Sequence, residues 1–216
     1  MIKLNNNEIS FTLITLAYWF FMLTDGALRM LVLLHFHVLG YTPLQLAYLF
    51  LLYEFLGMIT NLGAGWIAKK FGLNTTLFAG IILQIFSLMI LTQLDQTWSI
   101  TFSVLFVMFT QGLSGIAKDL TKMSAKSSVK LLSPNQNSKL FKWVSLMTGS
   151  KNAVKGFGFL AGALLLSFTS FETSLMIMAL ILALMFVLLL INLKTNISEV
   201  KKKSKFSEVF SNNKDI

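Results

Sequence analysis

Long apolar runs, separated by short polar segments, fill most of the chain between residues 11 and 192. A helix needs about 20 mostly apolar residues to cross the hydrocarbon core of a bilayer. By this measure, the pattern predicts six membrane-spanning helices in an all-α membrane protein. The predicted spans are residues 11–36, 44–68, 75–94, 98–118, 141–168 and 171–192. Residues 1–10 form a tail before this bundle, and residues 193–216 form a basic linker or tail after it.

Two of the predicted helices begin with capping chemistry. Thr42, Pro43 and Gln45 match a capping box with proline in the first helical position. The sequence SPNQ at residues 133–136 repeats the pattern and predicts that a helix restarts at the interface before the fifth span. Two ordinary turns are the alternative, and they leave the number of spans unchanged.

Composition agrees with a membrane protein. The chain is 55% hydrophobic and 12% charged, whereas a soluble domain carries about 25% charged residues. It has no cysteine, which excludes disulfides, thiolate metal sites and a cysteine nucleophile. The excess of 18 Lys and Arg over 9 Asp and Glu would suggest nucleic acid in a soluble protein. Here we expect no nucleic acid, because the basic residues follow a membrane topology.

The basic residues gather on one side of the predicted spans. The residues on this side are Lys3, Lys69, Lys70, Lys118, Lys122, Lys126, Lys130, Lys139, Lys142, Lys194, Lys201, Lys202, Lys203, Lys205 and Lys214. The loops on the other side, residues 37–43, 95–97 and 169–170, contain no Lys or Arg. Cytoplasmic loops are the ones enriched in these residues. The sequence therefore predicts a multi-pass protein of the plasma (inner) membrane with both termini in the cytoplasm.

Five charged residues fall well inside the predicted spans, where a charge costs about 2.5–3.5 kcal/mol on insertion scales. Asp25 and Arg29 lie four residues apart on one helical face, where they can pair. Glu54 falls at a similar depth in the second span. Lys151 and Lys155 are also four residues apart, and like charges at this spacing repel each other.

These five residues allow two interpretations. The simpler one is that they form buried ion pairs that only hold the helices together. The other is a water-filled cavity between spans one, two, four and five that receives an anion such as a phosphate or a related oxyanion. In this hypothesis Arg29, Lys151 and Lys155 bind the substrate. Asp25 and Glu54 hold those cations in place or carry a coupling proton.

Lys118, Lys122, Lys126 and Lys130 recur at every fourth position, which predicts a basic stripe on a helix that extends below the membrane from the fourth span. The stripe is typical of positive charge near anionic lipid headgroups. The alternative is a funnel that draws anions toward a cytoplasmic mouth. We expect Lys118 and Asp119 to form part of a cytoplasmic gate.

An enzyme is not expected. Ser114 lies in GLSG, which matches the G-x-S-G of the rhomboid proteases, but that chemistry needs a histidine in the last span. Residues 171–192 contain none. No cofactor or metal site is indicated. The glycines predict close helix packing instead; they are Gly112, Gly115, Gly156, Gly158 and Gly162.

The segment GWIAKKFGLN resembles the loop signature of the major facilitator superfamily, G-x-x-[AS]-D-[RK]-[LF]-G-R. The matching residues are Gly65, Ala68, Lys70, Phe71 and Gly72. Lys69 replaces the acidic position and Leu73 replaces the final arginine. The resemblance implies that Gly65, Lys70 and Gly72 belong to the cytoplasmic gate. In the family the acidic residue helps to latch two halves together, and this latch is missing here.

A longer resemblance covers LTDGALRMLVLLHFHVLGYTPLQLAYLFLLYEFLGMITNLGAGWIAKKFGLNTTLFAG, and also GLSGIAKDLTKMSAKSSVKLL with LFKWVSLMTGSKNAVKGFGFLAGALLL. These segments are similar to the organoarsenical efflux permease (ArsJ) family of the major facilitator superfamily. The resemblance implies arsenate resistance by export of 1-arseno-3-phosphoglycerate. This ester forms when a glyceraldehyde-3-phosphate dehydrogenase uses arsenate in place of phosphate, which implies a functional link to that enzyme.

Members of this family have about twice this length, with two halves facing each other across the substrate site. The resemblance therefore implies that the chain is the amino-terminal half of such a fold. Its partner would be a carboxy-terminal six-span half or a second copy. Two alternatives remain: a transporter of another organic anion, such as a sugar phosphate, and a membrane component that assembles with others without transporting.

Overall fold

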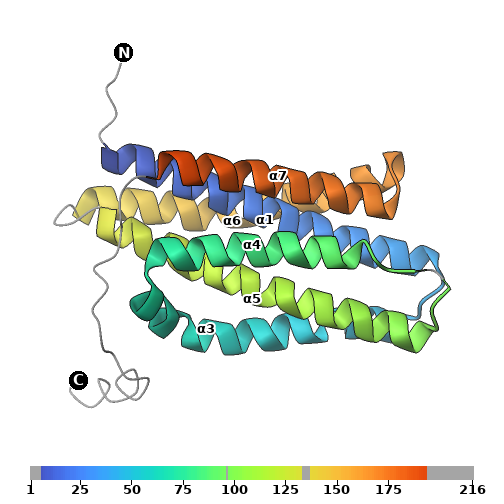
Figure 1. Cartoon of the computed structure of the whole chain (residues 1–216). Coiled ribbons are helices and arrows are strands. Elements are labelled where there is room, and N and C mark those ends of the chain that lie inside the picture. Colours follow the sequence, from blue (N-terminus) through green and yellow to red (C-terminus); the bar gives the residue numbers. More distant parts are fainter. Residues whose placement is uncertain (1–5, 96, 133–136, 194–216) are drawn as a thin grey trace.

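The computed structural model describes residues 6–95, 97–132 and 137–193 (Figure 1). These residues form helices joined by short connections, and no strand occurs among them. The helices are α1 (Asn6–Val38), α2 (Pro43–Leu49), α3 (Leu51–Phe71), α4 (Leu73–Leu91), α5 (Ile100–Leu132), α6 (Asn137–Phe168) and α7 (Phe171–Asn192). The predicted cap at residues 133–136 and nearly all of the predicted C-terminal tail lie outside the described residues.

The helices correspond to the six predicted spans, because α2 and α3 together occupy the second one. Within the described residues, five segments are long and apolar enough to cross a membrane: α1, α2 with α3, α4, α5 and α7. Helix α6 has 32 residues but is not among these five. Lys142, Lys151 and Lys155 lie in its first two thirds and lower its mean hydropathy.

Several helices extend beyond the predicted spans. Helix α1 begins at Asn6, inside the predicted tail, and α5 continues past the predicted end at residue 118 to Leu132. No proline or glycine interrupts residues 116–132, and Ala125 and Val129 of this extension are fully buried. An apolar run measures the part of a helix that suits lipid, whereas the helix itself continues until a breaker stops it.

The second span is divided at Phe50, which neither proline nor glycine marks in the sequence. The predicted capping box starts α2: the Gln45 backbone N–H donates to Thr42 Oγ1 at 3.4 Å, and the Thr42 N–H donates to Gln45 Oε1 at 2.8 Å. Phe50 then has φ −105° and ψ 0°, and its N–H donates to the carbonyl of Ala47 at 3.2 Å. Helix α3 starts directly after it.

Gly72 is the single residue between α3 and α4. Its φ of 90° lies in the left-handed region, which a residue without a Cβ adopts readily. Its N–H donates to the carbonyl of Ala68 at 2.9 Å, which closes α3. Its own carbonyl accepts from Thr76 Oγ1 at 2.7 Å in the first turn of α4. This glycine, predicted as part of a gate, therefore has a clear local role at a sharp helix joint.

The helices pack around α1 and α5. Helix α1 contacts α6 most extensively and also contacts α5 and α7, while α5 packs against both α3 and α4. Figure 1 shows α7, α1 and α6 running side by side, with α4, α5 and α3 below them. The helix ends near residues 38–43, 92–95 and 97–99 meet on one side of the bundle (Figure 1). The core is mainly apolar but also holds buried polar side chains, among them Asp25, Gln84 and Asp119.

Close helix approach at glycines is confirmed for four of the five predicted positions. A Cβ at Gly158 of α6 would overlap the Leu23 carbonyl oxygen of α1, and one at Gly162 would overlap that of Ala27. The same substitution at Gly115 and Gly112 would meet α3. The prediction is wrong for Gly156, because no heavy atom outside its own helix turn lies within 4 Å of its Cβ position.

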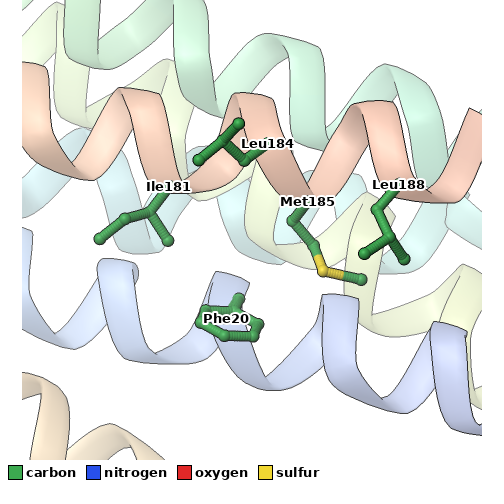
Figure 2. A pocket seen from close by; sticks show the side chains of 5 residues that line it. All are labelled: Phe20, Ile181, Leu184, Met185 and Leu188. Carbon is green, nitrogen blue, oxygen red and sulfur yellow. The ribbon is translucent and has the colours of Figure 1, made fainter.

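A shallow apolar groove of about 300 Å³ runs along α1 and α7 (Figure 2). It is lined by Phe20, Ile181, Leu184, Met185 and Leu188. Leu184 and Leu188 are exposed, as are many other large apolar side chains on the outer surface of the bundle. Such a surface is suited to lipid rather than water.

Candidate functional site

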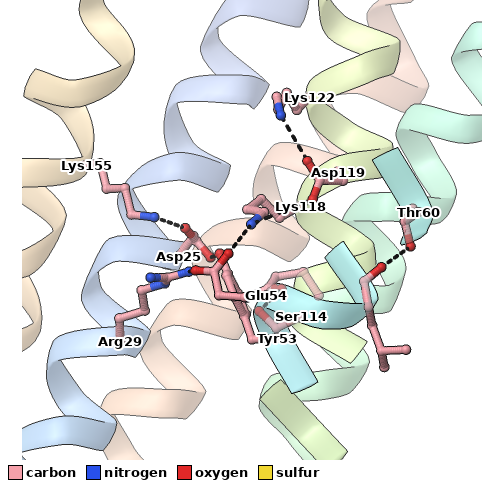
Figure 3. Close-up of polar contacts among 12 residues, drawn as sticks. Asp25, Arg29, Tyr53, Glu54, Thr60, Ser114, Lys118, Asp119, Lys122 and Lys155 are labelled. Atoms are coloured by element: carbon pink, nitrogen blue, oxygen red, sulfur yellow. Dashed lines mark hydrogen bonds and ion pairs between the residues drawn. The ribbon is translucent and has the colours of Figure 1, made fainter. Parts of the chain in front are cut away.

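Asp25 is the most deeply buried acid of the predicted site, with 1% of its surface exposed. Its Oδ2 lies 2.9 Å from Lys155 Nζ of α6, and its Oδ1 accepts a hydrogen bond from the hydroxyl of Tyr53 on α3. Figure 3 shows the three side chains converging from different helices. The sequence allowed a pair between Asp25 and Arg29, but the structure pairs Asp25 across the helix interface instead.

Arg29 has a partner on a neighbouring helix as well. Its Nη2 forms an ion pair with Glu54 Oε1 of α3, which confirms that the two residues lie at the same level of the bundle. The side chain of Glu54 remains 62% exposed. Lys118 Nζ of α5 lies 3.8 Å from Glu54 Oε2, so this carboxylate lies between two cations. Solvent or a ligand can reach the pair from the open side of Glu54.

Tyr53 is a central residue that the sequence analysis missed. Its side chain is fully buried. The guanidinium carbon of Arg29 lies 4.0 Å from the centre of its ring, and Lys118 Nζ lies 4.2 Å away. Both distances are within the range of cation–π attraction. Tyr53 therefore contacts two cations through its ring and the buried carboxylate of Asp25 through its hydroxyl. In the sequence, its only signal was its place directly before Glu54.

Asp119 connects the centre of the site to the basic stripe on α5. Its side chain is 6% exposed, and its carboxylate lies 3.7 Å from Lys118 Nζ and 3.1 Å from Lys122 Nζ. A Cβ at Gly57 of α3 would lie 2.8 Å from Asp119 Oδ2. The missing side chain at Gly57 thus leaves room for this carboxylate. The structure places Lys118 and Asp119 beside Glu54, and their role in a gate stays a prediction.

Lys151 differs from the other two predicted anion-binding residues. It is partly exposed and forms no ion pair with any residue that the structure describes. The charges of Lys122, Lys155 and Lys126 repel it, and Asp119 attracts it. Of the three predicted cations, Arg29 and Lys155 are thus neutralised by carboxylates and Lys151 is not.

The predicted gate residues of the loop signature lie apart from this cluster. Gly65 is 11 residues after Glu54 on α3, about 16.5 Å along the helix at 1.5 Å per residue. No heavy atom lies within 4 Å of a Cβ built at Gly65. Lys70 Nζ lies 4.9 Å from the ring centre of Trp66 and 5.3 Å from that of Phe71. The structure therefore divides the predicted site into a charged centre and a separate helix end.

Other polar side chains form hydrogen bonds between neighbouring helices. The Ser114 hydroxyl donates to Gln84 Oε1 of α4 at 2.7 Å, at a fully buried position. The Ser87 hydroxyl donates to the Thr110 carbonyl at 2.6 Å. Within the described part of the chain, no three His, Cys, Asp or Glu residues are grouped as metal ligands. The serine of the GLSG motif therefore joins α5 to α4.

The charged centre contains more cations than carboxylates. The cations are Arg29, Lys118, Lys122, Lys126, Lys151 and Lys155, and the carboxylates are Asp25, Glu54 and Asp119. Each carboxylate is already shared with one or two cations. Such a centre has a positive potential that attracts anions. Whether a water-filled cavity surrounds it stays a prediction.

Long apolar helices that bury a network of charged side chains define a multi-pass helical membrane protein. The sequence profile of the Major Facilitator Superfamily matches residues 14–214. The chain therefore belongs to this superfamily of membrane transporters. No curated protein matches the chain.

Proposed function

We propose that the protein exports a multiply charged organic anion from the cytoplasm, and that this anion is an arsenate ester such as 1-arseno-3-phosphoglycerate. The observation that carries the proposal is the excess of cations over carboxylates where α1, α3, α5 and α6 meet. The organic arsenate itself rests on the resemblance of two long segments to the organoarsenical efflux permeases.

An ion-paired scaffold alone accounts poorly for this excess. An attraction between unit charges 4 Å apart is about 4 kcal/mol at an effective dielectric constant near 20, and a repulsion has the same size. A scaffold would balance its charges, as Asp25 and Lys155 do. Lys126 and Lys151 add positive charge without a carboxylate partner among the described residues. A bound anion supplies the missing negative charge.

Arg29 and Lys155, two of the three predicted substrate residues, have different roles in this proposal. Arg29 offers a planar group that suits the oxygens of a phosphate or arsenate. Its partner Glu54 is largely exposed, so an incoming anion can take the place of that carboxylate. Lys155 is held by the buried Asp25 and contributes positive potential near the substrate. Asp25 and Glu54 would hold the cations in place, and either could carry a coupling proton.

The gate is proposed at two places. Lys118 and Asp119 would open or close the path beside Glu54. Gly65, Lys70 and Gly72 would act at the cytoplasmic end of α3, next to the joint with α4. Alternating access requires two units that rock against each other around the substrate. The partner of this six-span unit would be a second such unit, from the same protein, from a separate chain or from a second copy.

Growth on arsenate tests the export of an organic arsenate. Arsenate-sensitive cells would express the protein with its second unit, with or without a glyceraldehyde-3-phosphate dehydrogenase. We expect growth protection only when the dehydrogenase is present, because that enzyme makes the ester. Replacing Lys151 and Lys155 by glutamine in a D25N background, so that Asp25 is not left buried without its cation, should abolish protection at unchanged expression. Protection that does not depend on the dehydrogenase, or that survives these substitutions, would contradict the proposal.

Uptake into everted membrane vesicles separates the two alternative functions. A transporter of another anion, such as a sugar phosphate, would accumulate a labelled sugar phosphate in these vesicles without protecting cells from arsenate. A membrane component that only assembles with others would accumulate neither compound. The buried pair of Asp25 and Lys155 favours this last alternative. Lys151, which has no ion-pair partner among the described residues, argues against it.

A further inference from the structure

Three lysines lie on α5 and α6, two helices that contact each other beside the ion-paired centre. Lys122 and Lys126 lie one turn apart on α5, and Lys151 lies on α6. All three are partly buried rather than extended into solvent. Lys122 Nζ lies 3.1 Å from Asp119, and Lys151 lies one turn before Lys155, whose Nζ lies 2.9 Å from Asp25. Lys122 and Lys151 therefore border the same ion-paired centre from two helices that both pack against α1. The charges of Lys122 and Lys126 act on Lys151.

The carboxylates around this cluster are already engaged. Asp25 pairs with Lys155, and Glu54 pairs with Arg29 and Lys118. Asp119 alone reaches toward the cluster, and it also lies near Lys118. Among the residues that the structure describes, Lys126 and Lys151 therefore have no ion-pair partner.

We propose that Lys122, Lys126 and Lys151 form a binding site for a phosphate dianion, distinct from the centre formed by Arg29 and Glu54. The ligand is a phosphate or arsenate monoester group, which carries nearly two negative charges at neutral pH. The site rests on the proposed function, because it would receive the charged end of the exported ester. The headgroup of an anionic lipid presents the same chemistry, and the experiment below separates the two sources.

A binding role and a structural role predict opposite effects on the unliganded protein. Without an anion, the three ammonium groups repel one another, and like charges one helical turn apart are mildly destabilising. Neutralising two of them should therefore leave the apparent melting temperature unchanged or raise it. A lysine kept for structure would instead lower the melting temperature when it is replaced.

The indole of Trp19 provides a reporter close to this cluster. Its Nε1 donates to Ser150 Oγ at 2.8 Å, and Ser150 directly precedes Lys151 on α6. An anion bound between α5 and α6 changes the electric field at this indole. The fluorescence of Trp19 should therefore respond to binding, and W19F should remove that part of the signal.

The experiment uses the whole chain in nanodiscs of phosphatidylcholine and titrates inorganic phosphate at constant ionic strength. The apparent melting temperature and the tryptophan fluorescence are both followed. K126Q/K151Q is compared with K69Q/K142Q, which removes the same charge from exposed lysines outside the cluster. We expect the first variant to bind phosphate at least about tenfold more weakly, a difference of about 1.4 kcal/mol. The second variant should bind like the parent protein.

The results that would overturn the site are equally specific. Phosphate binding that is equal in all three proteins, or equally weakened in both double variants, would show that the cluster is not a site. So would a parent protein that does not respond to phosphate in any nanodisc. A drop in the melting temperature of K126Q/K151Q without phosphate would assign the lysines to structure.

A second series replaces part of the lipid by phosphatidic acid. If this lipid prevents the phosphate response in the parent protein and itself shifts the fluorescence through Lys126 and Lys151, the site stands and its ligand is a headgroup. The proposed export and the proposed phosphate site can also be disproved independently of each other. Binding that needs these lysines in a protein that exports neither arsenate nor phosphate esters contradicts the proposed export alone. Export that K126Q/K151Q leaves unchanged contradicts the site, and with it the substrate-binding role of Lys151, but not the export itself.

Discussion

Lys155 Nζ on α6 lies 2.9 Å from Asp25 Oδ2 on α1, and this ion pair crosses the most extensive helix contact of the bundle. The two backbones are close at this level. A Cβ at Gly26 would lie 2.6 Å from the carbonyl oxygen of Lys155. The pair therefore depends on a glycine beside the acid as well as on the opposite charges.

Removing one partner of this pair should destabilise the protein strongly. K155M leaves the buried Asp25 without its cation, and D25N leaves Lys155 without its anion. An uncompensated buried charge costs about 3–5 kcal/mol, whereas removing both charges is often neutral. We expect each single variant to be less stable than D25N/K155M. Thermal unfolding in detergent would measure this order, and a double variant less stable than both singles would refute it.

Tyr53 should contribute through both its ring and its hydroxyl. Y53F keeps the ring beside Arg29 and Lys118 but removes the donor to the buried Asp25, which should cost about 1–3 kcal/mol. Y53L also removes the cation–π contacts and should cost more. Stability and transport should both fall in the order parent, Y53F, Y53L. Equal values for Y53F and the parent would mean that Asp25 finds another donor.

The glycines of α6 allow a matched comparison on one helix. G158A places a methyl group on the Leu23 carbonyl, and overpacking of this kind costs about 1–3 kcal/mol. G156A meets no atom within 4 Å and should be neutral or slightly stabilising, because alanine favours a helix over glycine. In thermal unfolding, the melting temperature should therefore fall for G158A and stay unchanged or rise slightly for G156A. Equal effects would contradict the close contact.

The orientation of the chain can be tested with single cysteines, because the sequence contains none. Asp95 lies in the connection between α4 and α5, and Lys69 is exposed near the end of α3. We expect a membrane-impermeant maleimide to label D95C on intact cells, and K69C only after the membrane is opened. Labelling of K69C on intact cells would reverse the predicted topology.

The apolar pattern predicted the helices well because hydrophobic length is a local property of the chain. The capping box at Thr42 and the packing glycines of α5 were predictable for the same reason. The break at Phe50 was not predictable, because no residue with special backbone freedom marks it. The continuation of α5 beyond its span was predicted from the basic stripe, because its lysines recur at every fourth position, and the structure confirms a helix as far as Leu132.

The charged residues of the site were visible in the sequence, but their partners were not. A charge in an apolar run is a local signal, so Asp25, Arg29 and Glu54 could be selected one by one. Pairing depends on which helices touch, and Asp25 pairs with Lys155, which is 130 positions further along the chain. Tyr53 was missed because a tyrosine in an apolar span is common, and only the fold brings two cations to its ring.

The joint at Gly72 has a mechanical consequence. A connection of one residue has no slack, since its N–H closes α3 and its carbonyl accepts from the first turn of α4. If the end of α3 is displaced, the start of α4 moves with it. The two helices are therefore expected to rotate together as one rigid unit. A longer connection would let each helix move alone.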